Sequence, residues 1–346
     1  MRVVVTGATG NVGSALVDAL AGEDTVTEIV GVARRRPERT VDKVRWEVAD
    51  VGTDPLDGLM RGVDAVVHLA WVIQPARRPE VLRRTNVTGT ERVAMAAARE
   101  GVPALVHASS IGAYSPRPGA SVDESWPTNG VRTAQYSREK VATERILDRL
   151  EREQPLMRVV RMRPALTGTA EAGLELHRLF MGPLVPRALM APGRIPLVPE
   201  LGVQVQLVHT HDVADAYRRA VLSDVRGALN VAADPPVDAA LLARVLGARV
   251  VPAPARLARL AMSAAYRARL QPTPPGWFDM ARGAPLLDTA RIRSQLGWAP
   301  RRGPEDIVRE VLDGIRGGRG RPTPPLRGRV GDRALRESRE HPRTPA

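Results

Sequence analysis

Apolar and polar positions alternate regularly over the first 165 residues of the chain. Short β-branched runs, typical of buried strands, recur at 2–7, 28–33, 43–48, 64–70, 104–110 and 157–163. Between them, apolar residues recur at helical spacing, most clearly at 11–22, 80–101 and 136–153. Nearly continuous apolar strands that alternate with helices predict a parallel sheet covered on both faces, which is a doubly wound α/β fold.

The pattern loosens after residue 165, where Pro and Gly interrupt the apolar runs. We predict a core over 1–165, with a return at about 204–232, and a small C-terminal lobe made of 166–203 and 233–315. Two apolar segments of the lobe, 176–190 and 271–280, could line a hydrophobic pocket. Packing in the lobe's own core is the favoured interpretation, because apolar stripes usually pack.

Composition limits the class of protein. With 43% hydrophobic residues in 346, the chain can bury a sizeable core. It has no cysteine, which excludes disulfides and thiolate metal sites. No apolar run approaches the roughly 18 residues of a membrane span, and the apolar stretch at the start is too short for a signal peptide. We therefore expect a cytoplasmic protein without a membrane partner.

Roughly half of the formal net charge of +13 lies in the C-terminal segment. From residue 316 to the end there are nine arginines and three acids, in a Gly- and Pro-rich segment. Such a composition predicts a basic, disordered tail over 316–346. Because about half of the excess charge lies there, the charge of the whole chain is weak evidence for a nucleic-acid partner, and we expect none.

A glycine-rich turn joins the first strand to the first helix. Gly7, Gly10 and Gly13 stand in TGATGNVG, directly before the helix at 11–22. A tight turn needs positive φ, a phosphate needs bare backbone, and a helix N-terminus offers unpaired N–H groups. This strand, loop and helix context predicts a dinucleotide site of the Rossmann type.

The end of the second strand bears on the choice of dinucleotide. An acid that binds the adenosine 2′-hydroxyl is expected there, but the sequence has Ala33 followed by Arg34. Guanidinium groups pair with phosphates, so NADP is weakly preferred over NAD. A solvated arginine loop is the other interpretation. Asp50, at the end of the third strand, is placed to meet the adenine.

Tyr136 and Lys140 lie four residues apart at the start of a predicted helix, on one face of it. A nearby ammonium lowers the pKa of a phenol, which lets it exchange protons with a substrate. The chain has only two lysines and four tyrosines, so this pairing predicts a function. Ser109 and Ser110 end the fifth strand, at the sheet edge where ligands bind, and either hydroxyl can hold a substrate oxygen.

These motifs resemble the extended short-chain dehydrogenase/reductase superfamily, in particular its NAD(P)-dependent epimerase/dehydratase family. The matching segments are TGATGNVG, DAVVHLA, NVTGT, SSIGAY, YSREK, VRMRPALTG, HTHDVADAY and LDTARIRSQLGWAP. The resemblance implies a Ser110, Tyr136 and Lys140 triad with Asn86 as a helix-kink or relay residue. The cofactor contacts that it implies are Gly7, Thr9, Gly10, Asn11, Val12, Gly13, Arg34, Asp50, Val51, Leu69, Ala70, Tyr136, Lys140 and Pro164.

The implied activity is reversible hydride transfer between NAD(P) and a carbonyl or hydroxyl substrate, either a nucleotide sugar or a small hydrophobic carbonyl. The lobe carries no recognisable nucleotide-sugar signature. The alternative is a non-catalytic NAD(P)-binding sensor or assembly protein of the same fold. The resemblance also implies a homodimer.

Other polar residues carry weaker signals. A dehydratase would need a further acid near the tyrosine, and Asp123 and Glu124 are the nearest candidates in sequence. His68 and His107 lie within strand runs and are expected to be hydrogen-bonded core residues. His209 and His211 come without a third ligand, so no metal is predicted.

Overall fold

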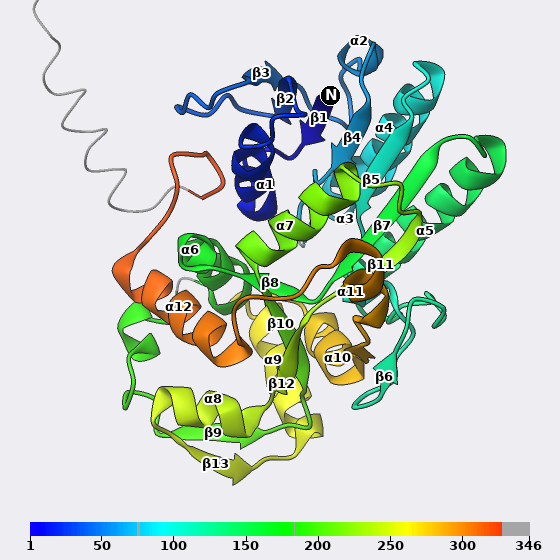
Figure 1. Ribbon diagram of the computed structural model, residues 1–346. Coiled ribbons are helices and arrows are strands. Elements are labelled where there is room, and N and C mark those ends of the chain that lie inside the picture. The colour runs from blue at the N-terminus through cyan, green and yellow to red at the C-terminus, as the bar shows by residue number, and fades with distance from the viewer. Residues whose placement is uncertain (75–76, 183, 327–346) are drawn as a thin grey trace, which may run out of the picture.

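A computed structural model describes residues 1–74, 77–182 and 184–326 and shows a sheet-based core with a smaller lobe beneath it (Figure 1). The helices are α1 (Asn11–Ala21), α2 (Asp57–Met60), α3 (Pro79–Arg83), α4 (Gly89–Arg99), α5 (Gln135–Glu153), α6 (Gly173–Leu176), α7 (Thr210–Val221), α8 (Ala239–Leu246), α9 (Ala255–Arg267), α10 (Gly276–Gly283), α11 (Ala290–Leu296) and α12 (Pro304–Gly317). The strands are β1 (Arg2–Thr6), β2 (Glu28–Ala33), β3 (Val44–Val48), β4 (Ala65–His68), β5 (Ala104–Ala108), β6 (Ser121–Val122), β7 (Arg158–Pro164), β8 (Leu166–Gly168), β9 (Leu197–Glu200), β10 (Val205–His209), β11 (Gly227–Val231), β12 (Ala233–Val237), β13 (Arg249–Pro252) and β14 (Leu286–Leu287). Short 3-10 turns are η2 (Ile111–Ala113), η3 (Ala170–Ala172) and η5 (Arg187–Met190), and π-helical turns are η1 (Arg84–Thr88) and η4 (His177–Met181).

Seven parallel strands form the central sheet, in the order β11-β7-β5-β4-β1-β2-β3. Val3, Val4 and Val5 of β1 are fully buried at its centre, which explains the uninterrupted apolar run. The strand order reverses on the two sides of β1, and ligands of such sheets bind at the carboxyl ends of the strands near that reversal. The predicted doubly wound Rossmann fold is confirmed.

Helices cover both faces of this sheet. On one face, Leu16 of α1 and Tyr217 of α7 pack in a single cluster with Val3 and Val5. On the other face, α2, α4 and α5 pack against alternate strand residues such as Val4. The two clusters are separate because successive strand residues point to opposite faces.

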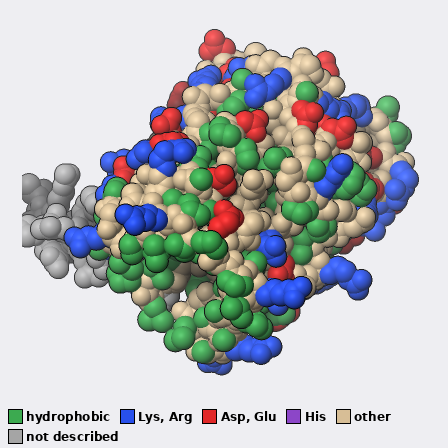
Figure 2. Space-filling view, turned by 90° about the horizontal axis from the view of Figure 1, so that it is seen from below, with side chains coloured by type: hydrophobic (Ala, Val, Ile, Leu, Met, Phe, Trp, Pro, Cys, Tyr) green, Lys and Arg blue, Asp and Glu red, His purple; other side chains and the backbone are tan. Residues whose placement is uncertain are grey.

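The lobe contains three small sheets and the helices α6, α8, α9, α10 and α12 (Figure 1). Its surface, seen from below in Figure 2, shows many hydrophobic side chains with arginines scattered among them. The exposed large apolar side chains of the lobe include Leu184, Leu257, Leu260 and Leu270. Among the described residues, large apolar side chains are thus exposed to solvent more often in the lobe than in the core.

The segment 204–232 divides between the two parts of the molecule. β11 completes the central sheet beside β7, and α7 packs against α1, as expected for a return to the core. β10, by contrast, pairs with β8 and β12 in the lobe's three-stranded sheet. Val208 of β10 nevertheless packs in the same hydrophobic cluster as Val3 and Val5 of the central sheet, so β10 joins core and lobe and the assignment of 204–209 to the core stays a prediction.

The C-terminal segment differs from the predicted tail at its start. After α12, residues 318–326 fold back onto the protein, where Thr323 is fully buried and Leu326 is 2% exposed. Arg321 forms an ion pair with Asp18 of α1 at 3.0 Å. The predicted disorder thus does not apply to 316–326, and residues 327–346 lie outside the described part. None of the helices in the described ranges is long and apolar enough to cross a membrane.

Candidate active site

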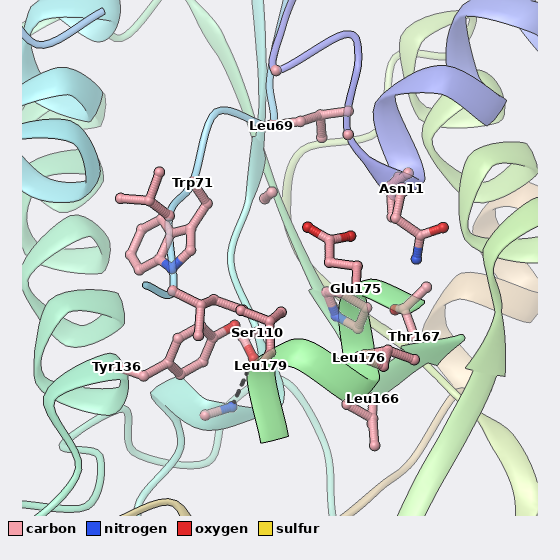
Figure 3. A pocket seen from close by; sticks show the side chains of 18 of the residues that line it. Asn11, Leu69, Trp71, Ser110, Tyr136, Leu166, Thr167, Glu175, Leu176 and Leu179 are labelled. Carbon is pink, nitrogen blue, oxygen red and sulfur yellow. Dashed lines mark hydrogen bonds between the residues drawn. The ribbon is translucent and has the colours of Figure 1, made fainter. Parts of the chain in front are cut away.

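A cavity of about 930 Å³ runs from the carboxyl ends of the central strands into the lobe. Its walls include the glycine loop after β1, the ends of β2 to β5, and residues of η4, α9 and α10. Figure 3 shows Asn11 and Leu69 toward one end and Trp71, Ser110 and Tyr136 on one wall. The predicted cofactor and substrate residues therefore share one continuous space.

The glycine loop has the shape that a dinucleotide needs. Gly7 has φ +70°, and a Cβ there would lie 2.7 Å from the backbone of Leu69 and Ala70. A Cβ on Gly13 would lie 2.2 Å from the carbonyl oxygen of Gly7. Bare backbone at the N-terminus of α1 therefore faces the cavity, and this arrangement fits a phosphate group.

All fourteen predicted cofactor contacts except Lys140 line this cavity. Arg34 and Asp50 lie at the ends of β2 and β3, where the adenosine half of a dinucleotide would lie. Arg35 also lines the cavity and was not predicted, whereas the neighbouring Arg36 does not line it. Arg34 and Arg35 are exposed, so their guanidinium groups are accessible to a phosphate.

Ser110 and Tyr136 lie together on the cavity wall (Figure 3). Ser110 caps η2, where its hydroxyl accepts a hydrogen bond from the backbone N–H of Gly112 at 3.0 Å. Tyr136 is the second residue of α5, and its phenol forms a hydrogen bond with Ser110. Both side chains thus present hydroxyl groups to the same part of the cavity.

Burial raises the pKa of Tyr136 to about 12, and the hydrogen bond with Ser110 only partly opposes this rise. The sequence predicted a pKa lowered by Lys140, and in this geometry that prediction is wrong. The reason is that desolvation of a phenol disfavours the phenolate more strongly than its neighbours stabilise it. At neutral pH, Tyr136 therefore holds its proton.

Lys140 lies behind the cavity wall and is 2% exposed. Its Nζ lies 3.3 Å from the centre of the Trp71 ring and 5.6 Å from that of Tyr136. It donates a hydrogen bond to the carbonyl oxygen of Ala108 at 2.6 Å. Burial lowers the pKa of Lys140 well below its ordinary value, which Glu144 and Glu139 oppose. The ammonium group thus touches Trp71 more closely than the tyrosine.

Asn86 is buried in the π-helical turn η1, away from the cavity. Its side-chain amide bonds both the N–H and the carbonyl of Val72 at 2.8 Å and donates to Glu139 at 2.7 Å. Asn86 therefore ties the segment after β4 to α5. Because Trp71 belongs to that segment, this clamp also fixes the ring that covers Lys140.

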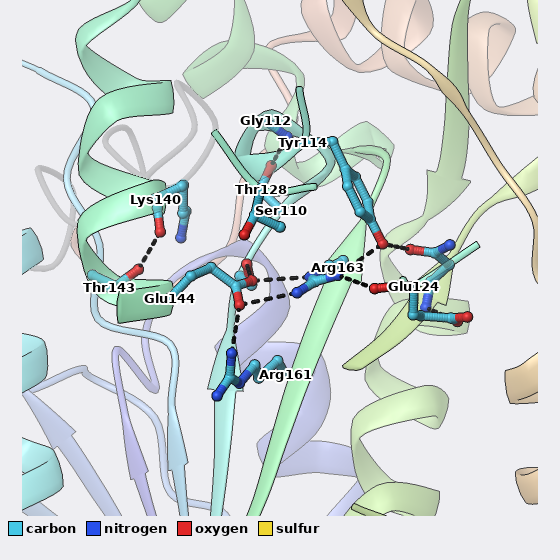
Figure 4. A network of polar contacts seen from close by, with 12 residues as sticks. Ser110, Gly112, Tyr114, Glu124, Thr128, Lys140, Thr143, Glu144, Arg161 and Arg163 are labelled. Carbon is cyan, nitrogen blue, oxygen red and sulfur yellow. Dashed lines mark hydrogen bonds and ion pairs between the residues drawn. The ribbon is translucent and has the colours of Figure 1, made fainter. Parts of the chain in front are cut away.

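A buried ionic network holds the serine-bearing loop from below (Figure 4). Glu144 of α5 accepts hydrogen bonds from Ser109 at 2.5 Å, from Arg163 at 2.9 Å and from Arg161 at 3.0 Å. Its arginine partners and Ser109 hold the pKa of Glu144 at about 2 although burial acts in the opposite direction. The Ser109 hydroxyl is thus engaged by Glu144, which leaves Ser110 as the serine that faces the cavity.

Aromatic residues gather around the tyrosine although they are rare in the chain. Trp71 meets Tyr136 edge-on with ring centres 5.7 Å apart, Tyr136 lies 4.8 Å from Trp277, and Trp277 lies 5.1 Å from Phe180. Of the 5 Trp, 4 Tyr and 2 Phe in the sequence, seven line the cavity. They are Trp71, Tyr114, Tyr136, Phe180, Tyr217, Trp277 and Phe278.

These contacts change the interpretation of the two apolar lobe segments. Leu176, Leu179 and Phe180 come from the first, and Trp277 and Met280 come from the second. Both segments therefore line the hydrophobic pocket, which was the less favoured of the two predictions. The sequence shows that aromatic residues are rare, but residues 71, 180 and 277 are too far apart in the chain for any local pattern to predict that they meet in one pocket.

The remaining polar candidates lie elsewhere. Asp123 accepts hydrogen bonds from Ser125, and Glu124 accepts one from the backbone of Asn230, so neither faces the cavity. His68 bonds Thr6 and Thr90, as expected for a core residue. His107 is buried, but both ring nitrogens lack a partner within the described ranges, contrary to the expected hydrogen bonding.

His209 bonds Glu310 at 3.3 Å and stacks on His211. Across residues 1–74, 77–182 and 184–326, no group of three or more His, Cys, Asp or Glu side chains is arranged to hold a metal ion.

The strand order and the glycine cradle together define a dinucleotide-binding protein of the Rossmann class. A family model described as NAD dependent epimerase/dehydratase family matches residues 3–232. The chain belongs to this family, which confirms the resemblance seen in the motifs.

Individual relatives differ in what they cover. A 3-diazoavenalumate denitrifying reductase from a Streptomyces species is 32% identical, over 87% of this chain and 96% of that protein. An uncharacterized protein of Mycobacterium tuberculosis (strain ATCC 25618 / H37Rv) is 26% identical over 92% of this chain, but the chain spans only 30% of that relative's length. The crystal structure of DesIV, a dTDP-glucose 4,6-dehydratase from Streptomyces venezuelae with NAD and TYD bound, shares the fold. Its TM-score is 0.68 and its identity 20%, over 94% of this chain and all of that one.

Proposed function

We propose that the protein is an NAD(P)-dependent oxidoreductase that interconverts a carbonyl and a hydroxyl group on an apolar, aromatic substrate. One observation carries this proposal: Ser110 and Tyr136 face a single cavity that begins at the glycine cradle and ends among aromatic side chains. Family membership supports NAD(P) as the cofactor, and the Streptomyces relative is itself named as a reductase.

The side chains supply the proton and the orientation. Bound NAD(P)H would supply a hydride to the carbonyl carbon, and NAD(P)⁺ would accept one in the reverse direction. The Ser110 hydroxyl donates a hydrogen bond to the substrate oxygen, and Tyr136 gives its proton to that same oxygen, which yields the alcohol and a tyrosinate. Because its pKa is raised to about 12, Tyr136 carries this proton at neutral pH. Lys140 does not line the cavity, and its Nζ lies 5.6 Å from the centre of the Tyr136 ring, so we assign it a positioning role behind the phenol and not a contact with the cofactor.

The charges of the cavity favour an apolar substrate over a nucleotide sugar. Among the described residues that line the substrate half, the charged side chains are Glu175 and Arg178. Arg178 donates to the carbonyl oxygen of Pro325 at 3.2 Å. A nucleotide diphosphate needs several cationic or N–H donors, whereas this half of the cavity offers mainly aromatic and aliphatic surface.

A panel of carbonyl compounds tests this proposal. Aryl aldehydes and ketones, short aliphatic aldehydes, and UDP- and dTDP-glucose would be compared by NAD(P)H absorbance. We expect kcat/KM for the aryl compounds to exceed that for the short aliphatic ones by about 10- to 100-fold, the value of burying one aromatic ring. Turnover confined to the nucleotide sugars would contradict the proposal. No turnover of any compound, with tight cofactor binding, would favour the non-catalytic sensor.

We further propose that NADP is preferred to NAD. Arg34 and Arg35 line the adenosine end of the cavity, and β2 ends in Ala33 without an acid that would repel a 2′-phosphate. The Arg34→Ala substitution is expected to weaken NADPH binding by about 10- to 100-fold, the value of one charge-assisted hydrogen bond, and to leave NADH binding nearly unchanged.

Titrations of both dinucleotides, followed by fluorescence, measure this difference. The matched control is Arg36→Ala, because Arg36 is exposed on the same loop but does not line the cavity. Tighter binding of NADH than of NADPH by the wild type, with no effect of Arg34→Ala, would contradict the preference.

A further inference from the structure

Glu175 is a carboxyl group in the substrate half of the cavity, opposite the proposed catalytic groups. It lies on α6 and lines the cavity together with Leu176 and Leu179. Figure 3 shows its carboxylate pointing into open space, with Ser110 and Tyr136 on the facing wall. Among the described residues that line the cavity, the acidic side chains are Asp50, at the adenosine end, and Glu175.

Its carboxylate has no hydrogen-bond partner in the described part of the protein, and its one electrostatic partner is Arg178. Within the described residues the two side chains form no ion pair, and Arg178 is exposed and donates to the carbonyl oxygen of Pro325 at 3.2 Å. Burial raises the pKa of Glu175 to about 7. Carboxyl groups in apolar surroundings are unfavourable unless a partner bonds them, and the open side of this one faces the ligand space.

The same position disfavours a diphosphate. The Glu175 carboxylate would repel the phosphate groups of a nucleotide-sugar substrate, because both carry negative charge. A hydroxyl or amino group of a substrate would instead donate a hydrogen bond to this carboxylate. Glu175 also comes from a different wall than Ser110 and Tyr136 (Figure 3), so a substrate whose carbonyl reaches Tyr136 would meet Glu175 with another of its groups.

We infer that Glu175 recognises a hydrogen-bond donor, a hydroxyl or an amino group, on a part of the substrate away from the reacting carbon. This inference rests on the proposed function and narrows it to apolar aromatic carbonyl compounds that carry such a donor. Glu175 is then a specificity residue. It leaves the chemistry at the carbonyl to Tyr136.

Three aryl aldehydes that differ in one ring substituent provide the test: one carries a hydroxymethyl, one an aminomethyl and one an ethyl group. The wild type is expected to prefer the two donors over the ethyl compound at least tenfold in kcat/KM, mainly through KM. Glu175→Leu should abolish both preferences. Glu175→Gln should keep part of the hydroxyl preference, because the amide oxygen still accepts, and lose the amine preference, because the charge is gone.

Controls separate this inference from its alternatives. Glu153→Gln, an exposed residue at the end of α5, should leave all three rates unchanged. An equal loss for all three aldehydes in Glu175→Leu, or a weaker cofactor Kd in Glu175→Gln, would overturn the inference. If the wild type turns over none of them, the proposed function fails. The role of Glu175 can then still be tested by calorimetry, with the alcohols that correspond to the three aldehydes as ligands of the wild type and of Glu175→Gln. Equal affinities of the two proteins for the hydroxymethyl and aminomethyl alcohols would refute that role.

Discussion

Replacement of Tyr136 by phenylalanine is expected to lower kcat by about 10²- to 10⁴-fold, the usual contribution of a positioned proton donor. The substitution removes one hydroxyl group from the cavity wall, and the ring contacts with Trp71 and Trp277 remain. Cofactor affinity and thermal stability should therefore change little. Steady-state kinetics with the best aldehyde of the panel, together with a cofactor titration, measure both effects.

The matched control for this substitution is Tyr266→Phe. Tyr266 lies on α9, where its ring stacks under Arg77 with the guanidinium carbon 4.0 Å from the ring centre, a contact that phenylalanine can also make. We expect Tyr266→Phe to behave as the wild type. Near-normal kcat in Tyr136→Phe would show that another group delivers the proton and would remove the tyrosine from the mechanism.

The second large effect is expected for Lys140→Arg, which keeps the positive charge but changes its shape. Lys140 is enclosed between Trp71 and the carbonyl oxygen of Ala108, with 2% of its surface exposed. A planar guanidinium group is broader than an ammonium group and does not fit the same enclosure. We expect at least a hundredfold loss of kcat/KM, and a loss of stability of about 1–3 kcal/mol from overpacking.

The chain offers a matched control in its other lysine, Lys43, which lies between β2 and β3 and does not line the cavity. Lys43 donates to the carbonyl oxygen of Glu23 at 2.8 Å, and Lys43→Arg should leave activity unchanged. Denaturant unfolding of each variant separates the loss of stability from the loss of turnover. Near-normal turnover in Lys140→Arg would mean that charge alone is needed at this position.

The sequence was most informative where chemistry and local structure coincide. The glycine loop could be identified because its geometry requires glycine: a Cβ on Gly7 or Gly13 would collide with backbone atoms, so the spacing of these residues in the sequence reports the shape of the loop. Tyr136 and Lys140 could be paired because they are four residues apart in one helix. The fold class followed from the alternation of buried strands and helices, and the structure confirms it.

The rest depends on contacts between distant segments. The pKa of Tyr136 is set mainly by burial, which helix spacing does not reveal. Trp71 could not be linked to Lys140, because that contact is made by a segment about seventy residues earlier in the chain. Likewise, the composition of residues 316–326 resembles a disordered tail, yet Thr323 and Leu326 are buried against the folded protein.

Glu175 is another residue whose role could not be predicted from the sequence. In sequence it is one acid in a mainly apolar stretch, and only the fold turns it toward the wall that carries Ser110 and Tyr136. A charged residue at that point is compatible with a solvated helix surface as well as with a ligand site. The cavity, which combines residues of both the core and the lobe, decides between these two interpretations.

The central claim is that Tyr136 and a bound nicotinamide cofactor reduce an aromatic carbonyl compound in this cavity. Its most direct test is transfer of deuterium from reduced cofactor labelled at nicotinamide C4, with the alcohol product analysed by mass spectrometry. The account predicts one deuterium on the former carbonyl carbon with the wild-type protein and a rate lowered at least a hundredfold in Tyr136→Phe. Product without deuterium, or equal labelling rates in the two proteins, would contradict it.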